Sequence, residues 1–324
     1  MNNLIPLLLP LLFVTVYGSG FVGAKLGLPH SEPFTFLALR FALAGAILLL
    51  AALLLKKTKP VHLGWMFLSG LLLQGVFSVG VFYALYLGMT PAVSALIIAL
   101  QPLLVAVLSA FFLAETVPPK RWFGLFLGLL GVAIVVIDGL ATNSITILNL
   151  SWALLGLLGL TFGQLLQKRY CADMDLLSGG AFQTLSAALV MGLYGYLFES
   201  MSVNWNNEFI IALLWMSIGV SIGALSLLYL MIRQQSSTQV ASVFYGVPVA
   251  AALVAWPLFG QVPSAVDWLG FAIVALAVVI ANHSPAQNSP AQKQTTQSID
   301  VGNNPRQTKK FCFDNAETNC LDKH

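Results

Sequence analysis

Charged residues are scarce in this sequence of 324 residues: Asp, Glu, Lys and Arg together make up 8%, whereas 58% of the residues are hydrophobic. A soluble domain carries charge on about 25% of its residues, so this chain cannot cover itself with a surface that faces water. The composition therefore excludes a soluble protein and predicts an integral membrane protein. The small net charge of +3 gives no reason to expect nucleic-acid binding.

Cysteine and histidine are scarce as well. The three cysteines and four histidines all fall in expected loops or in the C-terminal tail: Cys171, Cys312, Cys320, His30, His62, His283 and His324. This distribution supports no disulfide framework and no metal site. It also leaves no histidine, aspartate pair or ligand set inside a span for an intramembrane enzyme. We therefore expect no catalytic residues, no bound metal and no cofactor.

Long apolar runs are what the chain has in abundance. A helix needs about 20 apolar residues to cross a bilayer, and ten runs are long enough: 4–26, 33–55, 63–88, 90–113, 120–138, 148–170, 177–199, 208–231, 236–259 and 265–282. The strict alternation and the short strands, of about ten residues, of an outer-membrane barrel are absent from these runs. The fold class is therefore predicted to be an all-α integral membrane protein with ten transmembrane helices.

The basic residues of the loops predict the orientation, because cytoplasmic loops are enriched in Lys and Arg. With the N-terminus in the cytoplasm, only Lys25 falls on the outer side, and eight basic residues fall on the inner side: Lys56, Lys57, Lys59, Lys120, Arg121, Lys168, Arg169 and Arg233. We expect both termini in the cytoplasm, an uncleaved first span, and a cell membrane location, with a bacterial inner membrane favoured. The segment 285–324 is rich in Gln, Asn, Ser and Thr and is predicted to be a disordered cytoplasmic tail.

An internal repeat organises the ten spans. When the sequence is aligned with itself at an offset of 146 residues, scarce residue types match and the span boundaries coincide. The matched pairs are Thr15 and Thr161, Phe36 and Phe182, Tyr83 and Tyr229, Pro102 and Pro248, Trp122 and Trp268, and Gly124 and Gly270. The two domains are 4–138 and 150–284. Because each contains five spans, the second is inverted in the membrane. Inverted repeats are typical of alternating-access transporters, and the alternative is that duplication only built a larger bundle.

The same residues carry a family resemblance. The first repeat resembles the EamA-type domain of the drug/metabolite transporter superfamily at Thr90, Ala92, Ser94, Pro102 and Glu115, followed by Trp122 and Gly124. The second repeat resembles it again at Thr238, Ala241, Ser242 and Pro248, followed by Trp268 and Gly270. Arg40 looks like that family's usual arginine. The resemblance implies a secondary transporter of small metabolites, with efflux of amino acids or related compounds favoured. One departure is Gln261, which stands where the second repeat would match Glu115. Glu115 is a candidate for coupling or gating, and its alternative is an ordinary helix-end residue near the interface.

Few polar groups lie inside the spans, and these are the candidate functional residues. An arginine inside a bilayer costs about 2.5 to 3.5 kcal/mol on insertion scales, so Arg40 is either structural or attracts an anionic solute. Pro102 and Pro248 break the fourth and ninth spans at equivalent places and predict either hinges beside a binding site or packing kinks. The candidate substrate-binding residues lie on spans that the resemblance places around the cavity: Gln74, Tyr83, Ser94, Gln101, Gln164, Ser221, Tyr229, Ser242 and Tyr245. Each of these could instead be a hydrogen bond between helices.

The leading hypothesis is thus an alternating-access permease whose partners are a small-molecule solute and the lipid bilayer, and a homodimer is left open. A passive uniporter or channel is the first alternative. Multidrug efflux is disfavoured because no carboxylate lies deep in the first span. A membrane scaffold or an intramembrane enzyme is the alternative outside transport. The scarcity of charge further predicts that uncharged groups do most of the solute recognition.

Overall fold

The computed structural model describes residues 5–55, 62–113, 119–141, 145–260 and 264–282. All of these residues belong to one compact unit, Met1–Ser284. Glu115, Gln261 and the tail segment 285–324 lie outside the described residues. The predictions made for them therefore stay predictions.

The described chain forms ten helical stretches in the order that the apolar runs predict. The first five are α1 (Ile5–Gly27), α2 (Pro33–Leu54), α3 (Leu63–Gly70) continued by η2 (Leu71–Val76) and α4 (Phe77–Tyr86), α5 (Pro91–Ile98) with α6 (Gln101–Phe112), and α7 (Pro119–Ala141). The second five are α8 (Ile147–Tyr170), α9 (Leu176–Phe198), α10 (Asn207–Leu214) continued by η3 (Trp215–Ala224) and α11 (Leu225–Gln234), α12 (Ser237–Val243) with η4 (Phe244–Gly246) and α13 (Val247–Phe259), and α14 (Ala265–Asn282). A short 3₁₀ turn, η1 (Leu28–His30), follows α1.

Eight of these stretches are long and apolar enough to cross a membrane, and shorter apolar segments in α7 and α14 account for the other two. A helix satisfies its own backbone hydrogen bonds, which is why apolar runs of this length adopt it in lipid. The protein is an all-α integral membrane protein with ten transmembrane helices in two inverted repeats of five. The predicted fold class is confirmed.

Polar residues mark several helix starts, as helix capping requires. The Thr90 side chain accepts a hydrogen bond from the Val93 backbone at the start of α5, and the Asp175 carboxylate accepts bonds from two backbone amides at the start of α9. Thr146 and Asn149 cap α8 reciprocally. These residues therefore fix where the helices begin at the ends of the bundle.

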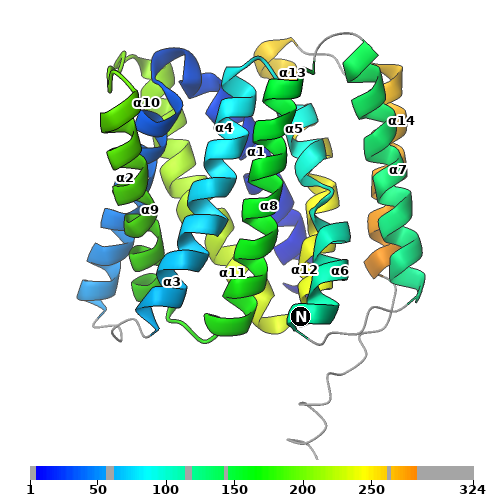
Figure 1. Cartoon of the computed structure of the whole chain (residues 1–324), viewed down its shortest axis with the longest axis horizontal. Coiled ribbons are helices and arrows are strands. Elements are labelled where there is room, and N and C mark those ends of the chain that lie inside the picture. Colours follow the sequence, from blue (N-terminus) through cyan, green and yellow to red (C-terminus); the bar gives the residue numbers. More distant parts are fainter. Residues whose placement is uncertain (1–4, 56–61, 114–118, 142–144, 261–263, 283–324) are drawn as a thin grey trace, which may run out of the picture. The chain divides into compact units, whose positions relative to one another are not determined.

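Equivalent helices of the two repeats pack against each other at the two edges of the bundle. In Figure 1, α2 and α9 lie side by side at one edge, and α7 and α14 lie side by side at the other. Between them, α4 and α8 approach very closely: a Cβ added at Gly80 would overlap the α8 backbone near Gly156. Small residues let transmembrane helices make such contacts. The central helices are therefore packed backbone against backbone.

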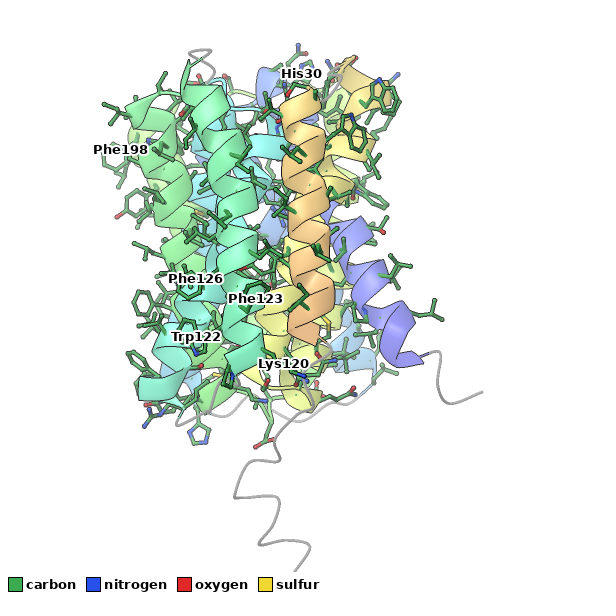
Figure 2. All side chains as sticks on the ribbon, turned by 90° about the vertical axis from the view of Figure 1, so that its right-hand side faces the viewer. His30, Lys120, Trp122, Phe123, Phe126 and Phe198 are labelled. Carbon is green, nitrogen blue, oxygen red and sulfur yellow. The ribbon has the colours of Figure 1, made fainter. Side chains whose placement is uncertain are left out.

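The two ends of the bundle differ in chemistry. The end at which α1 finishes and α2 begins is called the His30 end, and the opposite end is called the Lys120 end (Figure 2). At the Lys120 end, Lys168 donates to the Gln235 carbonyl at 2.8 Å and Arg233 donates to the Ala172 carbonyl at 2.7 Å. These basic side chains therefore donate hydrogen bonds to backbone carbonyls near the C-terminal ends of helices, where positive charge is favoured. The predicted orientation places this end in the cytoplasm.

Candidate functional site

Two π-helical segments occupy equivalent places in the two repeats. The segment η2 interrupts the third stretch, and the residues 146 positions further on fall within η3 of the eighth stretch. A π-helical turn is uncommon inside an α-helix and is frequent at functional sites, because the wider turn shifts side chains and backbone groups out of register. These segments present Gln74 and Ser221, two of the candidate residues, to the interior of the bundle.

Arg40 is buried among helices of both repeats, with 4% of its surface exposed. Its Nε donates to the Ser221 hydroxyl of η3 at 2.8 Å. Its guanidinium carbon lies 5.0 Å from the centre of the Phe41 ring and 5.9 Å from that of the Phe82 ring, within the range of cation–π attraction. No described carboxylate forms an ion pair with it. Arg40 therefore brings an unpaired positive charge into the interior.

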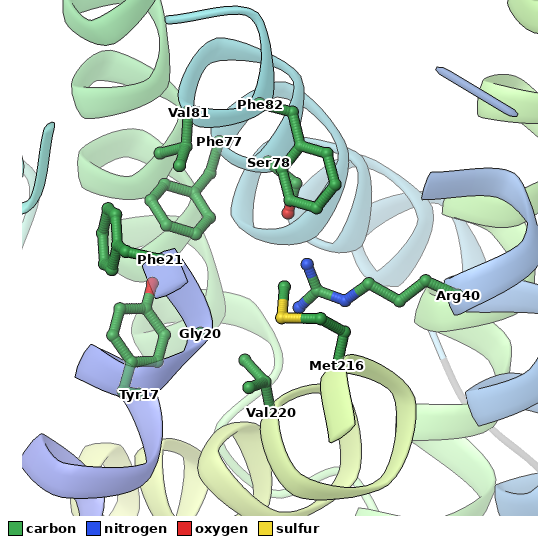
Figure 3. A pocket seen from close by; sticks show the side chains of 10 residues that line it. All are labelled: Tyr17, Gly20, Phe21, Arg40, Phe77, Ser78, Val81, Phe82, Met216 and Val220. Carbon is green, nitrogen blue, oxygen red and sulfur yellow. The ribbon is translucent and has the colours of Figure 1, made fainter. Parts of the chain in front are cut away.

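A small cavity of about 20 Å³ lies at the end of the Arg40 side chain. Figure 3 shows the guanidinium nitrogens and the Ser78 hydroxyl oxygen directed into this space. The rest of the lining comes from α1, α4 and η3 and is mostly apolar, with Tyr17, Phe77 and Met216 among its members. The cavity is large enough for one water molecule. It is therefore a small, mostly apolar site with one charged wall.

On the side of the Lys120 end, Tyr229 joins the two repeats through hydrogen bonds. Its hydroxyl donates to Gln183 Oε1 of α9 at 2.7 Å and accepts a bond from Gln74 Nε2 of η2 at 3.4 Å. The Thr184 hydroxyl donates to Gln74 Oε1 at 3.1 Å. All four side chains are buried, and each side chain has at least one partner in this network.

The network continues from Gln183 toward the loop after α8. Gln183 Nε2 donates to the Ser69 hydroxyl at 2.7 Å and to Gln167 Oε1 at 2.8 Å. Gln167 in turn donates to the Cys171 carbonyl at 3.1 Å. We name the residues that join the repeats here, Ser69, Gln74, Gln167, Gln183, Thr184 and Tyr229, the amide network. It holds α3, η2, α8, α9 and α11 together on this side of the cavity.

A second pair of buried amides lies where the fourth stretch breaks. Gln101 Nε2, at the start of α6, donates to Gln164 Oε1 of α8 at 2.6 Å, and Gln164 Nε2 donates to the Ser237 carbonyl at 3.0 Å. Gln101 Oε1 and the Ser94 hydroxyl are buried and have no hydrogen-bond partner among the described residues. Unpaired buried polar atoms are costly. The break between α5 and α6 therefore contains two buried polar atoms, Gln101 Oε1 and the Ser94 hydroxyl oxygen, that can still form hydrogen bonds.

At the His30 end, Glu199 joins the repeats. Its carboxylate accepts hydrogen bonds from the Phe34 and Thr35 backbone amides at 2.8 and 2.7 Å, from the Thr35 hydroxyl at 2.8 Å, and from the Tyr83 hydroxyl at 3.2 Å. A carboxylate at the N-terminus of a helix is favoured by the free amides and the helix dipole there. We name Thr35, Tyr83 and Glu199 the carboxylate latch; it ties the end of α9 to α2 and α4.

The loops at the same end are joined as well. Glu32 accepts hydrogen bonds from the Ser200 backbone and hydroxyl at 2.8 and 2.7 Å. The His30 carbonyl accepts a bond from the Asn204 amide at 2.8 Å, and the His30 ring contacts the Glu208 carboxylate at 3.1 Å. The loop before α2 is therefore fastened to the loop after α9 along its length.

Comparison with protein families decides which transporters the chain resembles. The model of the EamA-like transporter family matches it twice, over residues 4–137 and 147–282. The chain belongs to the EamA-like transporter family. Its curated relatives include the uncharacterized transporter YvbV of Bacillus subtilis, 26% identical over 86% of this chain and 92% of that protein. They also include the uncharacterized inner membrane transporter YedA of Escherichia coli, 27% identical over 82% of this chain and 86% of that protein.

A solved crystal structure shares the fold of this EamA-like transporter. Its TM-score is 0.66 at 20% sequence identity, and the alignment covers 85% of this chain and 96% of the other. At this identity the likeness speaks for the fold alone. Together, the family match and the apolar helices identify a multi-pass membrane transporter, whose setting implies a small-molecule solute and a lipid environment.

The structure of this EamA-like transporter distributes the candidate residues over several places. Arg40 and Ser221 meet at the cavity, whereas Tyr83 and Tyr229 lie at opposite ends. The Tyr245 hydroxyl donates to the Leu125 carbonyl of α7 at 3.3 Å, and its ring packs beside that helix. The tyrosines therefore do not surround one common site.

The two prolines begin the second halves of the broken stretches. Pro102 stands in the first turn of α6 and Pro248 in the first turn of α13, where the missing proline amide leaves no helical bond unmade. The side chain of Ser242 lies outside the described part of the chain. The hinge role of the prolines stays a prediction.

Several residues around the site of this EamA-like transporter were not anticipated from the sequence. Tyr17, Phe77 and Met216 line the cavity but are indistinguishable from other apolar residues in a span. Glu199 looks like a helix-end residue because it is the last residue of the seventh apolar run, 177–199. The sequence did contain one usable signal, Gln183, which is an amide within the seventh apolar run.

Proposed function

We propose that this EamA-like transporter is an alternating-access permease for small metabolites, with amino acids and related compounds as the first class to test and efflux as the expected direction. In alternating access, a central site opens to one side of the membrane at a time. The residue assignments at this site, the domain limits 4–138 and 150–284, and the coupling role of Glu115 belong to the same proposal.

One observation carries the proposal. The Arg40 cavity is accompanied by two sets of hydrogen bonds between the repeats, the carboxylate latch at the His30 end and the amide network on the side of the Lys120 end. Each set includes one of two equivalent tyrosines, Tyr83 or Tyr229. Hydrogen bonds of this kind can be exchanged for water when an end opens, because water replaces the lost partners. A permanently open channel has no need for such closures at both ends.

The experiment is a flux measurement in proteoliposomes that contain the purified protein. We expect uptake of a radiolabelled amino acid such as valine to be accelerated by unlabelled solute on the opposite side, or by an imposed proton gradient. Flux that follows only the solute's own gradient would favour the passive uniporter or channel. Absence of protein-dependent flux across a metabolite panel would remove transport of that class.

A paired variant tests the two closures. Tyr83→Phe and Tyr229→Phe each remove one hydroxyl and keep the ring, so both proteins are expected to fold while the gating balance shifts in opposite directions. Tyr196→Phe is the matched control, because its side chain on α9 is 76% exposed and belongs neither to the carboxylate latch nor to the amide network. Equal flux kinetics in all three variants would contradict the assignment of the first two tyrosines to gating.

A further inference from the structure

The guanidinium of Arg40 is only partly satisfied by the protein. A guanidinium has five N–H donors, and the described hydrogen bond to Ser221 uses one of them, on Nε. The remaining donors face a cavity in which the described lining supplies two hydroxyls, those of Ser78 and Tyr17, and otherwise rings, aliphatic groups and the Met216 thioether. Burying a charge without a counter-ion is costly. An anion that entered the cavity would therefore stabilise the arrangement.

The geometry restricts what that anion can be. A planar guanidinium with free neighbouring donors matches a carboxylate, which can accept two parallel hydrogen bonds. The site supplies a single cation among the described lining residues, and this suits one negative charge better than the two of a phosphate group. The guanidinium carbon lies over the Phe41 ring at 5.0 Å and over the Phe82 ring at 5.9 Å, so aromatic rings flank the charge.

The rest of the cavity would accommodate an apolar group. Tyr17, Phe21 and Phe77 come from α1 and α4, and Met216 and Val220 come from η3 on the facing side (Figure 3). Aromatic and thioether side chains pack well against aliphatic or aromatic ligand groups. The present volume of about 20 Å³ is smaller than any organic solute. Binding of such a solute therefore requires an opened form, in which α1, α4 and η3 move apart.

We propose that the Arg40 cavity is the solute site and that it selects monoanionic carboxylates with a small apolar body, the carboxylate pairing with Arg40 and the body lying against the aromatic lining. The proposal rests on the proposed transport function. It narrows the substrate class from amino acids, whose ammonium group would find no carboxylate among the described lining residues, to monoanionic carboxylates. It differs from the expectation that uncharged groups do most of the solute recognition. A structural arginine with its donors filled by protein carbonyls would need no such ligand.

The test is a binding measurement on purified protein in detergent, which does not depend on transport. Isovalerate, isovaleramide and isopentylamine have nearly the same shape and differ in charge, and each is titrated while the thermal unfolding midpoint is followed. We expect isovalerate to stabilise the protein at concentrations at least about tenfold lower than either analogue, because a hydrogen-bonded charge pair is lost in both. Equal stabilisation by the amide, or by sodium chloride in place of isovalerate, would overturn the proposal.

Variants locate the effect. Arg40→Gln is expected to abolish the difference between isovalerate and isovaleramide, and Arg40→Lys is expected to retain part of it because the charge remains but the planar fork is lost. Lys25→Gln is the matched control, because it removes a positive charge from the His30 end of α1, where Lys25 lies over the Phe259 ring. An unchanged preference in Arg40→Gln would place the site elsewhere. Should a variant fail to fold, the three-ligand comparison in the native protein still decides.

The binding result and the flux result separate the two proposals. Selective binding of isovalerate without flux in proteoliposomes would leave the carboxylate site standing and remove the permease. Flux that is equal for isovalerate and isovaleramide would leave the permease standing and remove the carboxylate selectivity.

Discussion

Glu199→Gln should open the His30 end of the bundle. The carboxylate holds four donors from α2 and α4, including the Phe34 and Thr35 backbone amides at 2.8 and 2.7 Å. A glutamine side chain keeps one oxygen that can accept hydrogen bonds. Its NH₂ group, however, is a donor and cannot accept bonds from the donors of α2 and α4. A hydrogen bond to a charged group contributes about 1.5 to 3 kcal/mol, and water at this rim replaces part of what is lost.

We therefore expect the closed form of this end to lose about 2 kcal/mol, which corresponds to about a 30-fold shift in the ratio of closed to open forms. The assay is the rate at which a maleimide labels Ser78→Cys in a background without other cysteines. Ser78 lies in the cavity and is 2% exposed, so labelling requires opening. With a membrane-impermeant reagent, comparison of right-side-out and inverted vesicles also reveals which side of the membrane the His30 end faces.

Glu208→Gln is the matched control for this measurement. Glu208 lies at the same end, its side chain is 66% exposed, and among the described residues its carboxylate contacts the His30 ring at 3.1 Å. Exposed pairs of this kind contribute about 0 to 1 kcal/mol, so its labelling rate should stay close to that of the native protein. A Glu199→Gln protein that labels no faster than the Glu208→Gln protein would refute the reasoning, because the carboxylate latch would then not hold this end closed.

Three further predictions concern the remaining contacts. Tyr229→Phe leaves the Gln183 amide oxygen without its 2.7 Å donor and should lower the free energy of unfolding by about 1 to 3 kcal/mol, measured by thermal unfolding; an unchanged midpoint would contradict it. Gly80→Ala should disrupt the contact between α4 and α8 and lower the yield of folded protein, whereas Gly64→Ala, which meets nothing within 4 Å, should not. Burial raises the pKa of the Cys171 thiol, so in the folded protein its maleimide labelling should need a higher pH than in the denatured protein, and identical pH profiles would argue against burial.

The helices of this protein could be predicted from the sequence almost completely, since a bilayer leaves an apolar run of 20 residues little choice but a helix. The breaks before Pro102 and Pro248 were equally predictable, because proline removes a backbone donor. The π-helical segments were not, since no residue type in Leu71–Val76 demands a wider turn. They depend on packing between distant helices, which one sequence does not display.

The arrangement of the candidate residues could not be predicted from the sequence, and the reason is geometric. Tyr83 and Tyr229 are equivalent in the repeat and were expected to share a site, but inversion of the repeat sends equivalent positions to opposite ends of the bundle. Arg40 could be picked out because a charged residue is rare in a span. The aromatic residues around it could not, because aromatic residues are common in spans. Which faces of α1, α4 and η3 meet depends on helix rotation, and apolar residues on every face hide that information.

Both tyrosines bond to the same helix. Tyr83 reaches Glu199 and Tyr229 reaches Gln183, so α9 is pinned at two points 16 residues apart, about 24 Å along its axis. A rigid rod that tilts by about 10° around one pin moves the other by about 4 Å, further than a hydrogen bond can stretch. In the proposed permease, a tilt of α9 about either of these points would therefore break the hydrogen bond at the other point.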